Sequence, residues 1–356
     1  MEEKKYIKRK EKAANDGNLE QLAVSCNNLG DFYNQHGKYQ QAAQEYQQEA
    51  ELYERLHKKL EMAKAHRMIG EMCMLLSEFD NAKQHINTYL KIVKNLHNKV
   101  EEQRAYATLG RAELLYGQSL SETSSKGGMD QLKQAEKAFL KSLLLTKELS
   151  GQITKLEQLD MQARCYLNIG VVKEHMEDFE ESITYIEKAI KISVSNDIFE
   201  LTHLCYISMS LLYFYKKNDA TLALRYCNLA LDIAKRLPNK VKRICETLIT
   251  KSEILIKEGD FASAKQILTK AYKKNTPDEN DRNTIEKSLR VGELNFLLDK
   301  KYTDKELKQQ QQQQKCIIDE SCRNHKKLNT NVANANADAD ADADDERYPV
   351  NNKTVG

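Results

Sequence analysis

A glycine recurs along much of this chain, each time directly after a leucine or an isoleucine. Gly30, Gly70, Gly110 and Gly170 are separated by 40, 40 and 60 residues. A repeat of this length is one supersecondary unit, which buries its apolar face only by stacking on its neighbours. The spacing therefore limits the chain to an array of similar units, each of about forty residues.

Each unit has the pattern of two amphipathic helices, because apolar residues recur at three- and four-residue spacing on both sides of a turn. In the first unit a helix around Gly30 precedes a turn at Gly37 and a second helix around Ala42. We expect Gly30 to let the two helices approach closely, with Ala42 as the small residue that faces it. Gly37 is expected to end the first helix in the left-handed conformation. With only three prolines in 356 residues, little in the chain interrupts helices.

Paired helices of this length and phrasing are typical of the tetratricopeptide repeat. The pattern recurs six times between residues 19 and 275, with Ser210 in place of the glycine in the fifth unit. The sequence therefore predicts an all-α, right-handed tetratricopeptide-repeat solenoid of about six helix pairs. In the third unit residues 119–131 are rich in Ser, Thr and Gly, and we expect them to form an exposed loop between the two helices.

The two ends of the chain differ from the repeats. Residues 1–18 are charged and predict an N-terminal helix, whose lysines are either solvated or form a weak basic patch or nuclear signal. Residues 276–300 predict a capping helix that covers the last unit. Residues 301–356 contain a glutamine run followed by alternating Asn/Ala and Asp/Ala, a composition that predicts a disordered tail.

Several classes of function are not supported by the sequence. A net charge of +2 gives no strong phosphate-binding signal, so we expect no direct nucleic-acid binding, and no apolar run is long enough to cross a membrane. Eight scattered cysteines without a Cys-x-x-Cys pair indicate reduced intracellular thiols. Cys316, Cys322 and His325 lie close together in the tail but lack a fourth zinc ligand. We therefore expect a non-enzymatic protein with no cofactor, metal or small-molecule ligand.

The candidate binding surface is the inner groove of the solenoid, which the first helix of each pair lines. The relevant positions are six, three and two residues before the glycine and one after it. Five residues there are basic and three carry side-chain amides, a combination suited to an acidic, extended peptide. The alternative is that these are ordinary exposed charges paired with neighbouring glutamates. The predicted groove residues are Asn27, Asn28, Asp31, Lys64, Arg67, Glu71, Arg104, Arg111, Arg164 and Asn168.

Several long phrases resemble a known family. They include AKAHRMIGEMCMLL, YLKIVKNLHNKVEEQRAYATLGRAELL, LEQLDMQARCYLNIGVVKEH and GDFASAKQILTKAYKKNTPDEND, together with the insertion in the third unit. With these phrases the chain resembles the amino-terminal repeat region of the Tonsoku-like family, in its insect form, over roughly residues 1–290.

The resemblance implies a nuclear scaffold that supports homologous-recombination DNA repair and recovery of stalled replication forks. Family members work with histones, histone chaperones, replication-fork factors and an Mms22-like partner. The family's ankyrin and leucine-rich repeats are missing from this sequence, so no histone-reading residue is carried over and the link to the Mms22-like partner is in doubt.

An alternative resemblance is to polarity adaptors of the Pins type, which orient spindles at the cell cortex and share the forty-residue period. The Tonsoku-like resemblance ends near Arg290. We therefore expect a truncated or alternative product, whose uncovered last helices make it marginally stable or self-associating.

Overall fold

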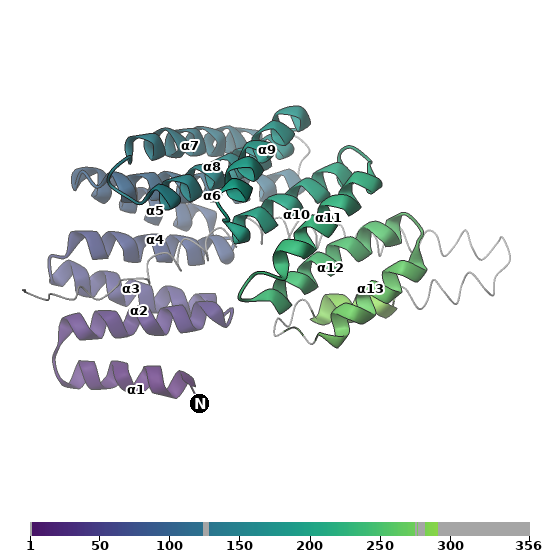
Figure 1. The fold of residues 1–356 in the computed structure, drawn as a ribbon. Helices are drawn as coiled ribbons and strands as arrows, with labels where there is room; N and C mark the ends of the chain where they lie inside the picture. Colours follow the sequence, from purple (N-terminus) through teal and green to yellow (C-terminus); the bar gives the residue numbers. More distant parts are fainter. Residues whose placement is uncertain (1, 124–127, 275, 277–281, 291–356) are drawn as a thin grey trace, which may run out of the picture. The chain divides into compact units, whose positions relative to one another are not determined.

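The computed structural model describes residues 2–123, 128–274, 276 and 282–290, and every named element in these ranges is a helix (Figure 1). The chain divides into two compact units, with the division between Met161 and Gln162. The first unit holds α1 (Glu2–Asn15), α2 (Leu19–Gln35), α3 (Tyr39–Arg55), α4 (Lys59–Leu75), α5 (Phe79–Asn95), α6 (Lys99–Thr123) and α7 (Met129–Glu148). The second holds α9 (Phe179–Ser195), α10 (Phe199–Tyr215), α11 (Ala220–Ala234), α12 (Lys240–Lys257) and α13 (Phe261–Lys273), and α8 (Lys155–His175) crosses the division.

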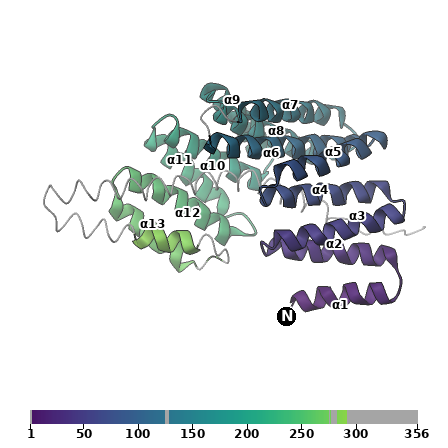
Figure 2. The ribbon, with the colours of Figure 1, turned by 180° about the vertical axis from the view of Figure 1, so that it is seen from behind.

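The helices form the six predicted pairs, from α2 with α3 to α12 with α13. Successive helices of the first unit lie side by side from α1 to α7, as the two views show (Figure 1, Figure 2). Among the described residues, no helix has the length and apolar character needed to cross a bilayer. The predicted all-α tetratricopeptide-repeat fold is thus confirmed.

Short turns with one left-handed residue separate many of the helices. Gly37 has φ +70°, as expected, but the same conformation is adopted by Ser77 (φ +61°) and Glu177 (φ +65°) in later repeats. The amide of Glu78 donates to the carbonyl of Cys73 at 2.8 Å, which ties the end of α4 into the following turn. The backbone geometry of the turn therefore persists where the glycine does not.

The repeated glycine brings the paired helices together, and its nearest neighbour on the second helix is a large side chain one turn beyond the expected small residue. A Cβ atom built on Gly30 would lie 2.7 Å from the ring of Tyr46, which is one helical turn beyond Ala42. At Gly110 the equivalent neighbour is Phe139, also at 2.7 Å. The glycine thus makes room for a large buried side chain of the second helix, and at Gly70 the backbone oxygen of Ala82, the equivalent of Ala42, also lies 3.4 Å from the built Cβ.

Two predicted boundaries differ from the structure. The loop expected at 119–131 is shorter, because α6 continues to Thr123 and α7 begins at Met129. Packing explains the extension: a Cβ on Gly117 would lie 3.1 Å from the side chain of Leu132, so these last turns still touch. Residues 124–127 lie outside the described part of the chain.

The expected terminal segments are described in part. Residues 1–18 contain α1, whose Tyr6 ring lies 5.2 Å from that of Phe32 on α2. Within the capping segment 276–300, residues 282–290 are helical, and Ile285 packs against Cys245 and Ala271 of the last pair. The predicted disordered tail 301–356, with its candidate zinc ligands, lies outside the described residues.

Candidate functional site

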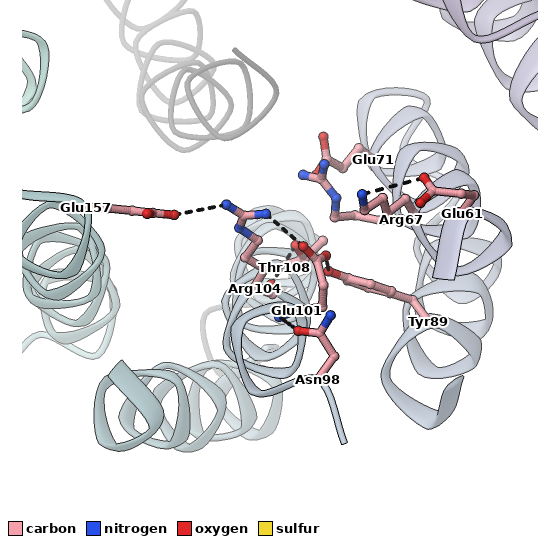
Figure 3. Close-up of polar contacts among 10 residues, drawn as sticks. Glu61, Arg67, Glu71, Tyr89, Asn98, Glu101, Arg104, Thr108 and Glu157 are labelled. Atoms are coloured by element: carbon pink, nitrogen blue, oxygen red, sulfur yellow. Dashed lines mark hydrogen bonds and ion pairs between the residues drawn. The ribbon is translucent and has the colours of Figure 1, made fainter. Parts of the chain in front are cut away.

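The third repeat places Arg104 at the centre of a polar chain that begins in the core (Figure 3). Tyr89 of α5 is fully buried and donates from its hydroxyl to Glu101 Oε2 at 2.5 Å. Burial raises the pKa of Tyr89 well above its usual value, which keeps the phenol protonated as a donor. The other oxygen of Glu101 lies 2.7 Å from Arg104 Nη1. The buried Tyr89 thus fixes the carboxylate of Glu101 on α6, and that carboxylate orients Arg104.

Arg104 also reaches the next first helix. Its Nη2 lies 3.4 Å from Glu157 Oε1 at the start of α8, and Figure 3 shows the guanidinium between the two carboxylates. The side chain of Glu157 is 36% exposed, whereas that of Glu101 is 6% exposed. Because an exposed ion pair contributes little, the contact with Glu157 is the weaker of the two and the one that a ligand carboxylate would replace first.

Arg67, Glu71 and Arg111 form a second group, which joins α4 to α6. Glu71 Oε1 lies 3.4 Å from Arg67 Nη1 and 3.0 Å from Arg111 Nη2, and all three side chains are about 95% buried or more. Two guanidiniums therefore share one buried carboxylate. In this arrangement a peptide reaches Arg67 or Arg111 only by displacing Glu71.

In the first repeat the predicted side chains contact α3. Asn27 Nδ2 donates to Glu49 Oε2 at 3.1 Å, and the hydroxyl of Tyr46 donates to Asp31 Oδ1 at 2.6 Å. Burial raises the pKa of Glu49 to about 8, and the hydrogen bond from Asn27, which lowers the pKa, offsets only part of this effect. Near neutral pH Glu49 is therefore mainly protonated, and this end of the surface carries less negative charge than its sequence implies.

The remaining predicted residues fall into two groups. Lys64 lies 3.5 Å from Glu61 one turn earlier on α4, and Asn28 is exposed on α2. Arg164, half-buried, and Asn168, buried, lie on α8 beyond Met161 and so belong to the second unit. The structure thus brings the first-unit residues onto neighbouring first helices, while Arg164 and Asn168 are described separately from them.

Of the acidic partners of these bases, Glu71 was among the predicted groove residues, and pairing with neighbouring glutamates was the stated alternative. The glutamates Glu61, Glu101 and Glu157 were not named individually, although a signal for two of them was present. Glu61 and Glu101 each lie nine residues before the repeated glycine and three before a base. That spacing places acid and base on the same face of a helix. Within the described residues, no cluster of three or more His, Cys, Asp or Glu side chains is arranged to hold a metal ion. The arrangement is suited to exchanging ion pairs with a charged polypeptide.

Comparison with known proteins identifies the repeats and the family. Tetratricopeptide repeat models match residues 22–59 and residues 163–194. A Tonsoku-like protein of Drosophila melanogaster is 73% identical over 291 residues, which covers 82% of this chain and 21% of that protein. The chain belongs to the Tonsoku-like family. The Tonsoku-like protein of Bos taurus is 32% identical over 268 residues, 75% of this chain and 19% of the relative. The chain thus spans about a fifth of the length of these Tonsoku-like relatives.

Solved structures that resemble this chain support its fold and carry no information about its function. Aspartyl phosphate phosphatase F from Bacillus subtilis has a TM-score of 0.53 at 12% identity, covering 79% of this chain and 73% of that one. A signal-transduction ATPase with a tetratricopeptide repeat sensor, from Pyrococcus horikoshii, has a TM-score of 0.53 at 14% identity, covering 79% and 44%. The family and its tetratricopeptide repeats make the Tonsoku-like chain a repeat scaffold for protein interactions.

Proposed function

We propose that this Tonsoku-like chain is a non-enzymatic interaction module that acts in the nucleus, in replication-fork recovery and homologous-recombination repair, by binding acidic extended peptides on its first helices. Family membership supports the cellular role and favours it over the Pins-type alternative. The observation that carries the binding mode is Arg104, which is held by a buried carboxylate on one side and by an exposed one on the other.

The proposed binding step is an exchange of ion pairs. A ligand carboxylate takes the place of Glu157 on Arg104, and a second replaces Glu61 on Lys64, while Glu101 keeps Arg104 oriented. Exposed Asn28 supplies an amide for the peptide backbone. Arg67, Glu71 and Arg111 remain as the buried floor, so their substitution would test folding more than binding.

The mechanism predicts a variant that binds more tightly. Glu157→Gln removes the competing charge from Arg104, so a fluorescent acidic peptide should bind it roughly threefold to tenfold more tightly than the unmodified chain. Glu51→Gln, an exposed acid on α3, is the control and should leave the affinity unchanged. Equal affinities of the Glu157 variant and the unmodified chain would contradict the exchange.

The loss-of-function test uses a groove variant that combines Lys64→Glu with Arg104→Gln. Its control combines Lys91→Glu with Lys191→Gln on exposed faces of second helices, and it changes the net charge by the same amount. Both proteins serve as bait in nuclear and cytoplasmic extracts, after melting curves establish that they fold. Histone chaperones or fork proteins that bind the unmodified chain and the control, but not the groove variant, are the expected result. Cortical polarity proteins in their place would overturn the nuclear proposal.

A further inference from the structure

The solvent face of α7 carries an apolar stripe inside a basic border. Leu140 and Leu144, one helical turn apart, are 41% and 50% exposed. Lys133, Lys137 and Lys147 continue the same face at alternating four- and three-residue spacing. This is the spacing of a helix seam that packs against another helix, but here the seam faces solvent.

The four lysines of this face outnumber the three acids of α7, which are Asp130, Glu136 and Glu148. Lys141 lies beside the stripe, and the ion pairs and hydrogen bonds among the described residues involve none of the ammonium groups of Lys133, Lys137, Lys141 and Lys147. Elsewhere in the first unit a base of a second helix, Lys83, does pair with an acid, Glu113 at 2.8 Å. The α7 face therefore combines exposed apolar surface with four lysines that form no ion pair among the described residues.

The corresponding face of α5 shows that this is not a general property of second helices in the unit. Its equivalent positions are all exposed and no large apolar side chain of α5 is exposed; they are occupied by Asp80, Gln84, Asn87, Lys91 and Lys94. Within the first unit α7 lies at the end opposite α1 (Figure 1). An ordinary solvated face has no need of two leucines at its centre.

We infer that the α7 face docks an acidic amphipathic helix of a partner protein. The partner's apolar side chains would cover Leu140 and Leu144, and its flanking carboxylates would pair with the four lysines. A second copy of this chain is disfavoured as the occupant, because two such faces would bring lysines against lysines. Nucleic acid would pair with the lysines but leave the leucines uncovered. The inference is independent of the groove, since these side chains lie on a second helix.

The test measures binding of a fluorescent synthetic helix of about 20 residues, with leucines at three- and four-residue spacing and glutamates elsewhere. Leu140→Ser with Leu144→Ser should weaken binding by at least tenfold, or about 1.4 kcal/mol. Lys133→Glu with Lys137→Glu should weaken it at least as much and reduce its dependence on salt. A peptide of the same composition, scrambled so that the leucines share no face, should bind poorly.

The matched control is on α5. Gln84→Glu, Asn87→Glu and Lys91→Glu together lower the net charge by as much as the two lysine changes on α7, and should leave the affinity within about twofold. Glu157→Gln in the proposed groove should also leave the affinity for the synthetic helix unchanged, which separates the α7 site from the groove. Equal binding of the scrambled peptide, or no effect of the leucine changes, would overturn the inference. Duplex DNA or phosphatidylserine vesicles that bind this face more tightly than the peptide would overturn it as well.

Discussion

His66 and His85 form a pair in which only one of the two facing ring nitrogens carries a proton. Their Nδ1 atoms lie 3.0 Å apart, so one ring must donate and the other accept. Burial lowers the pKa of both, and His85 lowers that of His66 further. The pair therefore favours the neutral form, in the position that Tyr166 and Tyr185 occupy in the fourth repeat at a ring distance of 6.2 Å.

The pair predicts acid sensitivity. Because the folded pKa values lie below the unfolded value of about 6.5, the unfolded chain binds more protons as the pH falls. Stability contributed by the neutral pair is present above that value and is lost as the pH drops through the folded pKa values. Replacement by the tyrosines of the fourth repeat, His66→Tyr with His85→Tyr, should flatten the melting temperature between about pH 7 and pH 5. His97→Asn, at an exposed turn, should keep the original slope.

Ser77 offers a second residue-scale prediction, because it has φ +61° without being a glycine. Ser77→Gly should stabilise the chain by about 0.5–1 kcal/mol, since the left-handed conformation no longer strains a side chain. Gly37→Ala is the reciprocal change. A Cβ there would meet no atom within 4 Å, so its cost is conformational alone and should be similar in size. Urea unfolding measures both, and equal stabilities of Ser77→Gly and the unmodified chain would contradict the strain.

At the scale of the helix pair, the repeated glycine sets the distance between helices. A Cβ on Gly70 would lie 2.8 Å from Ile86 Cγ1, so Gly70→Ala should destabilise the chain by about 1–3 kcal/mol. In an Ile86→Ala background the same change should cost at least about 1 kcal/mol less, because the opposing atom is gone. Additive effects in this double-mutant cycle, followed by denaturant unfolding, would mean that the contact is not what the glycine relieves. Asn87→Ala, on the exposed face of α5, is the near-neutral control.

The helix pairs were predictable because their signals are local. Apolar spacing and the recurring glycine gave six pairs, and the turn at Gly37 has the conformation predicted for it. The extended ends of α6 and α7 were not predictable, since they depend on the contact of Gly117 with Leu132 across the pair. The serines and glycines between α6 and α7 indicate a loop, and the sequence alone does not show the packing that extends both helices into it.

The candidate site was less predictable, because its electrostatics depend on neighbouring repeats. The positions of the groove residues followed from the repeat, and the Glu-to-base spacing around Glu101 was readable in the sequence. The sequence did not show that two arginines on different helices share Glu71. Likewise the raised pKa of Glu49 comes from burial under residues remote in the chain. Whether a peptide occupies the groove stays a prediction.

Across the whole molecule, a repeat array should respond to damage locally, since each unit depends on its neighbours. Glu71→Gln leaves two buried guanidiniums without their shared carboxylate and should destabilise the array by about 3–5 kcal/mol. Amide hydrogen exchange should then accelerate in α4 and α6, which the lost contacts join, while α12 and α13 keep their protection.

A reciprocal change tests this locality. Arg243 of α12 is held by Glu200 of α10 and by Glu246, the latter at 3.0 Å. Because burial reduces solvent screening of the Arg243–Glu200 pair, Glu200→Gln should weaken the joint between α10 and α12 and accelerate exchange there, with α4 and α6 unaffected. The two variants should thus give complementary protection maps. Loss of protection throughout both maps would instead mean that the repeats open together, with a single cooperative transition in place of nearest-neighbour coupling.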